Sequence, residues 1–259
     1  MIEALPSVLL VTFGAVLGAA LGSFTATLVI RWPAGRSVAK GRSACDGCGA
    51  SIPAYDLVPL ASFALRLGKA RCCGVPIDML HPIAELAGAA IGVIAFLAAP
   101  PIEASAGAGF GWLLLALALL DIRHFWLPNR LTLPLAILAL MSGLAGVGPH
   151  IVDRLIGGAI GYALFAAIRY GYRWLRGREG MGGGDAKLFG AIGLWLGWYM
   201  LPIVLLGATL AGLAFAVALT AAGKSMSRDT RLPFGPFLAL SAWLVWVAVA
   251  WNQSAPHLV

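Results

Sequence analysis

Long apolar runs, separated by short polar segments, dominate this sequence. The runs lie roughly at residues 7–30, 82–99, 108–122, 131–147, 154–170, 187–200, 202–222 and 234–251. A run of about 20 apolar residues matches the hydrocarbon thickness of a bilayer. Soluble proteins carry about a quarter charged residues, whereas charged residues make up only 11% of this chain. We therefore predict an all-α polytopic membrane protein with about eight transmembrane helices.

The runs divide the chain into three predicted regions. Residues 1–30 form the first transmembrane helix, because the apolar run from Leu5 to Ile30 is too long for the core of a signal peptide and has no basic segment before it. Residues 31–81 are polar, rich in Pro and Gly, and form a small cysteine-containing domain between the first two helices. Residues 82–259 form a seven-helix membrane domain.

Basic residues are distributed unevenly between the runs. Seventeen of the 18 Lys and Arg residues lie in segments 31–81, 121–130, 169–187 and 223–231. With eight spans these four segments all fall on one side of the membrane, and only Arg154 falls on the other. The positive-inside rule makes the basic side cytoplasmic and places both termini outside. The topology therefore explains the net charge of +7. We expect the protein to have a lipid bilayer as its partner and not a nucleic acid.

Two aspartates stand where apolar runs meet polar segments. Asp121 directly follows the run Gly-Trp-Leu-Leu-Leu-Ala-Leu-Ala-Leu-Leu, and Asp185 precedes the next run that starts on the cytoplasmic side. Acidic residues at membrane depth are energetically costly and are functional candidates by default. The predicted topology places both carboxylates at one depth on the cytoplasmic side.

Two neighbouring carboxylates cannot both ionise easily, so one acts as a base on water and the other as an acid toward a substrate carbonyl. This pattern predicts an aspartic peptidase with Asp121 and Asp185 as catalytic residues. The triplet Gly182, Gly183 and Gly184 permits close approach of an extended substrate, and we expect it to position the substrate together with Lys187. The triplet also disfavours a regular helix, which predicts open backbone around Asp185.

Other roles for the aspartates remain open. Asp121 could pair with Arg123 or His124, and Asp185 could cap a helix or pair with Lys187. Two carboxylates at broken helices also occur in transporters, although the two halves of this chain show no correspondence. A non-catalytic assembly subunit is a third alternative, and it predicts that Asn at either position leaves function intact.

All four cysteines lie in the polar region 31–81. Cys45 and Cys48 form a C-x-x-C pair, and Cys72 and Cys73 follow as an adjacent pair. Two cysteine pairs in a small domain predict a tetrahedral zinc site, and a reducing cytoplasm argues against disulfides. Adjacent cysteines reach one metal less easily, so free structural thiols are the alternative.

At these residues the chain resembles the type IV prepilin peptidases, a family of GxGD membrane aspartic peptidases that also act as N-methyltransferases. The matching segments extend along nearly the whole chain. They are Gly22-Ser23-Phe24, Arg31-Trp32-Pro33, Ser43 to Cys48, Asp56 to Leu60, Gly68 to Ile77, His81 to Glu85, Asp121 with Leu127-Pro128, and Gly180 to Leu188.

The resemblance implies a bacterial inner-membrane enzyme that serves a pilus or type II secretion machinery. Its substrates would be prepilins or pseudopilins, cut at the cytoplasmic face. The new N-terminal residue would then be methylated with S-adenosylmethionine as the donor. Glu85 would serve the methyl transfer or recognise the basic leader, and an ion pair or a helix cap is the alternative for this residue.

Four positions depart from the family pattern. Ala70 stands where the first cysteine of the second pair is expected, Cys73 matches the other, and Cys72 stands at a position that is usually not cysteine. Ala26 and Asn129 replace an Asn and an acidic residue. Both catalytic aspartates are retained, so a peptidase without methyltransferase activity is a further alternative.

Overall fold

A computed structural model describes residues 7–38, 43–177, 182–223 and 232–254. Each predicted run corresponds to one helix. These helices are α1 (Ser7–Arg31), α3 (Leu80–Ala98), α4 (Pro101–His124), α5 (Asn129–Leu144), α6 (Ile151–Arg176), α7 (Gly183–Leu196), α8 (Leu201–Ala221) and α9 (Gly235–Ser254). The segment between α1 and α3 holds two short helices, η2 (Ala54–Leu57) and α2 (Ala61–Leu65), and η3 (Trp198–Met200) precedes α8. The described ranges contain no β-strand beyond isolated bridges, so the predicted all-α class is confirmed.

The helices differ in whether they are long enough to cross a membrane. Among the described residues, six helices are long and apolar enough, namely α1, α3, α4, α6, α8 together with η3, and α9. Helices α5 and α7 have 16 and 14 residues, which span only about 24 and 21 Å against a core of about 30 Å. The polytopic membrane class is confirmed, and the count of eight crossings stays a prediction.

Several residues that entered the sequence predictions lie outside the described ranges. They are the basic residues Lys40, Arg42, Arg178, Lys224, Arg228 and Arg231, and Gly180 and Met181 of the glycine-rich motif. The orientation of the chain across a membrane therefore stays a prediction.

The chain divides into two compact units, Met1–Leu97 and Ala98–Val259. In the first unit α1 and α3 pack backbone against backbone. A Cβ on Gly18 would lie 2.1 Å from the carbonyl oxygen of Gly88, and one on Gly22 would lie 2.2 Å from that of Ala84. Small residues spaced four apart allow this approach, as is typical of membrane helix pairs. This division after Leu97 does not test the region boundaries predicted after residues 30 and 81, which stay a prediction.

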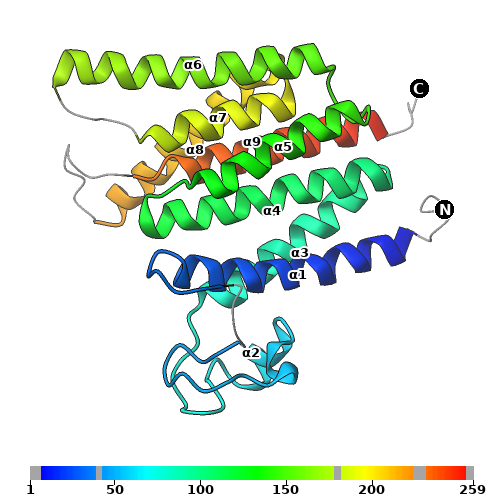
Figure 1. Ribbon diagram of the computed structural model, residues 1–259, viewed down its shortest axis with the longest axis vertical. Coiled ribbons are helices and arrows are strands. Elements are labelled where there is room, and N and C mark those ends of the chain that lie inside the picture. The colour runs from blue at the N-terminus through cyan, green and yellow to red at the C-terminus, as the bar shows by residue number, and fades with distance from the viewer. Residues whose placement is uncertain (1–6, 39–42, 178–181, 224–231, 255–259) are drawn as a thin grey trace. The chain divides into compact units, whose positions relative to one another are not determined.

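The second unit contains α4 to α9, which lie alongside one another (Figure 1). Helix α6 packs along α7, where a Cβ on Gly193 would lie 2.2 Å from the carbonyl oxygen of Gly157. Helix α4 packs against α5 and α9, and α5 packs against α7. This arrangement brings the end of α4 together with the beginnings of α7 and α9.

Arg154 at the start of α6 is a buried cation with a structural role that its sequence position did not reveal. Its side chain is 1% exposed. The guanidinium donates hydrogen bonds to the carbonyl oxygens of Ala139 at 2.7 Å and Leu194 at 3.1 Å, and also to those of Pro149 and Val147. A buried charge is tolerated only when it is compensated in this way. Arg154 thereby joins the C-terminal parts of α5 and α7.

Candidate functional site

Asp121 lies in the last turn of α4 and is 6% exposed. Its Oδ2 accepts a hydrogen bond of 3.0 Å from the backbone N–H of Gly235, the first residue of α9. A Cβ on Gly235 would lie 2.6 Å from that same oxygen, so only glycine allows this close approach. Sequence reasoning missed Gly235; the available signal was Pro233-Phe234-Gly235-Pro236, a helix-start pattern before the last apolar run.

Asp185 is the third residue of α7 and is 9% exposed. The end of α4, which carries Asp121, is joined to the first turn of α7, which carries Asp185, through Leu127 of the following loop, because a Cβ on Gly184 would lie 2.7 Å from Cβ of Leu127. Gly182, the residue before α7, lies beside Asp185, because a Cβ there would be 3.7 Å from Oδ2. Within the described residues Asp185 forms no ion pair with Lys187.

The glycines before Asp185 are part of a helix, so the prediction of open backbone is wrong from Gly183 onward. Glycine is destabilising chiefly in the middle of a helix, whereas Gly183 and Gly184 lie in the first turn of α7. Packing gives the glycines another reason. A Cβ on Gly184 would lie 2.7 Å from Cβ of Leu127, and one on Gly183 would lie 2.7 Å from Nη1 of Arg169. Both glycines therefore let α7 begin close to its neighbours.

Lys187 connects α7 to the beginning of α5. Its Nζ donates a hydrogen bond of 2.8 Å to Oδ1 of Asn129. Asn129 is the position where the family pattern has an acidic residue, so an amide oxygen accepts the bond here. Together with Leu127 against Gly184, this bond holds the α4–α5 loop against the first turn of α7. The two buried carboxyl groups therefore lie on helix ends whose positions are fixed by packing and hydrogen bonds. General acid–base catalysis needs such fixed positions, because the acid and the base must be within hydrogen-bond reach of the proton that moves.

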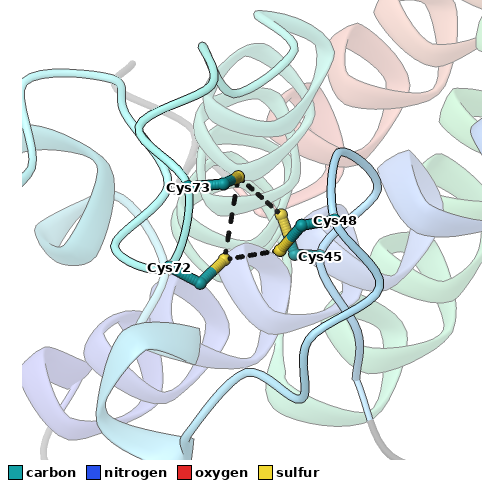
Figure 2. Close-up of side chains that lie close together, drawn as sticks. All are labelled: Cys45, Cys48, Cys72 and Cys73. Atoms are coloured by element: carbon teal, nitrogen blue, oxygen red, sulfur yellow. Dashed lines mark hydrogen bonds between the residues drawn. The ribbon is translucent and has the colours of Figure 1, made fainter.

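The four cysteines converge on one centre (Figure 2). Their sulfur atoms all lie within 4.8 Å of one another. The distance is 3.7 Å between Cys45 and Cys73, 3.2 Å between Cys48 and Cys72, and 3.8 Å between Cys72 and Cys73. A tetrahedral zinc with Zn–S bonds of about 2.3 Å separates its sulfur ligands by about 3.8 Å. The cysteines are therefore close enough to bind one metal ion, and the adjacent pair is no obstacle.

The cysteines lie on two loops of the same backbone shape. The first loop is closed by a bridge between Ala44 and Ser51, and the second by a bridge between Lys69 and Pro76. Cys45 N–H donates to the Ala50 carbonyl at 2.8 Å in the first loop. Ala70 N–H donates to the Val75 carbonyl at 2.9 Å in the second. Each loop also turns at a glycine with positive φ, at Gly49 and Gly74. The two loops are thus repeats offset by 25 residues, which sequence reasoning did not find.

The offset explains the unusual cysteine spacing. Ala70 occupies the place of Cys45, and Cys73 occupies the place of Cys48. Cys72, the residue directly before Cys73, occupies the place of Gly47. Its sulfur nevertheless lies in the cluster with the other three. Cys72 therefore supplies the fourth sulfur that Ala70 lacks.

The thiols differ in how easily they ionise. The backbone N–H groups of Cys48 and Gly47 lower the pKa of the Cys45 thiol to about 7. Hydrogen bonding to the Cys48 and Cys45 side chains raises the pKa of the Cys72 thiol to about 12. Because the thiolate is the metal-binding form, Cys45 is the thiol best prepared to bind first.

Glu85 lies on α3, in the same unit as the cysteines, and is 6% exposed. Its Oε2 accepts a hydrogen bond of 2.8 Å from the backbone N–H of Leu60. Leu60 has a φ of +60°, an uncommon conformation for a branched residue. Glu85 therefore holds a strained point of the cysteine-containing segment against α3.

Comparison with known proteins gives two family matches. A model described as the bacterial peptidase A24 N-terminal domain matches residues 16–99, which contain the cysteines and Glu85. A model described as the type IV leader peptidase family matches residues 108–217, which contain both aspartates. No solved structure matches the chain.

Several curated relatives carry the name prepilin leader peptidase/N-methyltransferase, and three of them are described here. The protein of Burkholderia pseudomallei (strain K96243) is 36% identical over 262 residues, covering 91% of this chain and 84% of the relative. That of Aeromonas hydrophila is 36% identical over 214 residues, covering 82% and 72%. That of Pseudomonas aeruginosa is 34% identical over 212 residues, covering 82% and 72%.

Proposed function

This chain belongs to the type IV leader peptidase family, and we propose that it cleaves the leader peptide of prepilins and then methylates the new N-terminal amine. The observation that carries the peptidase assignment is the pair of buried carboxyls, Asp121 and Asp185, at helix ends that the α4–α5 loop joins within the matched residues 108–217. Family membership favours this function over the transporter and over a non-catalytic assembly subunit.

Cleavage would use the two aspartates as an acid and a base. One carboxylate removes a proton from water, whose oxygen attacks the scissile carbonyl carbon, while the other carboxyl donates its proton to the carbonyl oxygen. The tetrahedral intermediate then collapses, the C–N bond breaks, and the amide nitrogen leaves with a proton. The products are a leader with a new carboxylate and a pilin with a new amine. Gly182, Gly183, Gly184 and Lys187 would position the substrate beside the aspartates.

Methylation requires a methyl donor, and the methyltransferase name of the relatives suggests S-adenosylmethionine. When bound to the protein, this cofactor would supply an electrophilic methyl group. Glu85 lies in the unit of the cysteine cluster, within residues 16–99, and would serve this reaction or recognise the basic leader. Zinc on Cys45, Cys48, Cys72 and Cys73 would join the two loops of that unit.

The cellular setting of this proposal follows the family. The chain would lie in the bacterial inner membrane, with cleavage on the cytoplasmic side to which the basic segments point. The seven-helix region 82–259 would carry the peptidase and region 31–81 the cysteine domain. Prepilins or pseudopilins of a pilus or type II secretion machinery would be the substrates.

An assay with the detergent-purified protein, a prepilin and S-adenosylmethionine tests the proposed function. Mass spectrometry of the pilin N-terminus reads both reactions in one spectrum. We expect loss of the leader and a gain of one methyl mass. Cleavage without the methyl mass would support the alternative of a peptidase that lacks the second activity, and an uncut prepilin would contradict the proposal.

The repeated loops make a specific prediction about the metal. Cys72→Ser should weaken zinc binding by more than the roughly 10- to 100-fold that loss of a supporting residue causes. The double change Ala70→Cys with Cys72→Gly returns the fourth sulfur to the place that Cys45 has in the first loop, and we expect it to restore binding. The number of zinc ions that each variant retains per chain after dialysis, measured by elemental mass spectrometry, tests both expectations. The placement of Cys72 is wrong if Cys72→Ser keeps its zinc.

A further inference from the structure

The loop between α4 and α5 follows directly on the helix end that carries Asp121. It consists of residues 125–128, and α5 begins at Asn129. At the start of the loop, the N–H of Phe125 donates a hydrogen bond of 3.0 Å to the carbonyl oxygen of Asp121. Phe125 has a φ of +50°, a conformation that a bulky residue keeps only when its surroundings hold it there. The backbone of Asp121 therefore fixes the direction in which the loop leaves α4.

The far end of the same loop contacts the first turn of α7 at two points. Leu127 packs on Gly184, where a Cβ would lie 2.7 Å from its own Cβ. Just after the loop, Oδ1 of Asn129 accepts a hydrogen bond of 2.8 Å from Nζ of Lys187. Gly184 precedes Asp185 by one residue, and Lys187 follows it by two. The two contacts therefore hold α7 on both sides of its catalytic residue.

Of these two contacts, only the one at Asn129 is directional. The apolar contact of Leu127 limits how closely the loop and α7 approach, but it permits sliding. A hydrogen bond requires both a short distance and a narrow range of angles. Because the first turn of α7 is helical, a rotation of this turn about its axis moves the side chains of Asp185 and Lys187 together. The bond to Asn129 therefore restrains the rotation that determines where the carboxyl of Asp185 lies.

We propose that Asn129 is a positioning residue of the peptidase, whose hydrogen bond to Lys187 holds the carboxyl of Asp185 where cleavage requires it. This inference rests on the proposed function, because it assigns Asn129 a part in the reaction of the two aspartates. Asn129 acts through Lys187 and takes no part in proton transfer. An ammonium group has three donors, so the bond to Asn129 leaves two with which Lys187 can contact the substrate.

Three substitutions test whether the acceptor at position 129 matters. Asn129→Ala removes the acceptor oxygen at an exposed position at the start of α5. Asn129→Asp is the conservative variant, because it keeps an oxygen in the same place and has the residue type of the family pattern. Asn252→Ala is the matched control, since it removes an exposed amide from the last turn of α9, at the other end of that helix from Gly235.

Single-turnover cleavage of a prepilin by the full-length protein in detergent, at increasing enzyme concentrations, gives the rate constant at saturation and the half-saturating concentration. We expect Asn129→Ala to lower the rate constant by about tenfold, which is part of the roughly 10²-fold effect of a 1 Å misplacement, because Leu127 still contacts α7. The half-saturating concentration should stay near that of the wild type. Asn129→Asp and Asn252→Ala should cleave at nearly the wild-type rate. Melting temperatures should change little, since the bond is exposed.

Lys187→Met, with and without Asn129→Ala, shows whether the two side chains act as a pair. Lys187→Met removes the donor of the bond together with any contact to the substrate, so its rate constant should fall at least as far as that of Asn129→Ala. Adding Asn129→Ala to Lys187→Met should then lower the rate constant no further, because residues that act through one contact show non-additive losses.

Three outcomes would overturn the positioning role and leave the proposed function intact. The first is an Asn129→Ala protein that cleaves like the wild type. The second is a higher half-saturating concentration with an unchanged rate constant, which would show that Asn129 contributes to substrate binding only. The third is a pair of losses that multiply in the double variant. A wild type that cuts no prepilin would overturn the proposed function and this role with it.

Discussion

Asp121→Asn and Asp185→Asn are each expected to lower the rate constant of leader cleavage by at least about 10³-fold, because general acid–base groups contribute about 10²- to 10⁴-fold each and act here as a unit. Asn has nearly the shape of Asp but cannot take up or release the proton that the reaction moves. Both side chains are buried, so water is poorly placed to substitute for them. Single-turnover cleavage of a prepilin with excess enzyme measures the rate constant.

Two controls separate lost chemistry from lost structure in these variants. Glu103→Gln makes the same kind of change on α4 away from the site and should cleave at the wild-type rate. Both aspartate variants should also be at least as stable to heat as the wild type. Cleavage within tenfold of the wild type in either Asn variant would refute the catalytic assignment and return the non-catalytic subunit to consideration.

Gly235→Ala is expected to lower the rate constant by about 10²-fold, the effect that a misplacement of about 1 Å has in a catalytic site. The added Cβ would lie 2.6 Å from Oδ2 of Asp121, so either the carboxylate or the first turn of α9 must shift. The hydrogen bond that now orients Asp121 would be lengthened or lost. Because the change does not involve the substrate, KM should move little while kcat falls.

Gly212→Ala on α8 is the matched control for Gly235→Ala. Its Cβ would have Phe237 as nearest neighbour at 3.5 Å, an ordinary contact, so cleavage and thermal stability should both stay near wild type. A Gly235→Ala protein that cleaves within twofold of the wild type would show that the approach of α9 to Asp121 has no catalytic importance.

The helices were predictable from sequence because each one is a continuous apolar run, and the errors lie at polar ends. Helix α4 begins at Pro101, whereas the apolar run was placed at 108, because the small and polar residues after Pro101 continue the helix without strong hydropathy. Helix α6 likewise continues to Arg176, beyond the predicted end at 170. Backbone hydrogen bonding extends helices past the part that hydropathy detects.

The candidate site was predictable at its side chains and not at its backbone groups. Asp121 and Asp185 are visible as acids beside apolar runs. The Gly235 N–H is a backbone group 114 residues from Asp121, and no residue type announces it. Cys72 was difficult for a related reason, since its sulfur reaches the cluster through a loop shape shared with residues 44–51 and not through a C-x-x-C spacing.

The cleavage rate constant of the double variant Asp121→Asn with Asp185→Asn, beside those of the two single variants, tests most directly whether the aspartates work as one catalytic pair. Residues that act as a unit show non-additive losses, since removing one already disables the other. We predict that the double variant cleaves no more slowly than the slower single variant. Losses that multiply in the double variant would contradict a shared site and would show that the two carboxyls act independently.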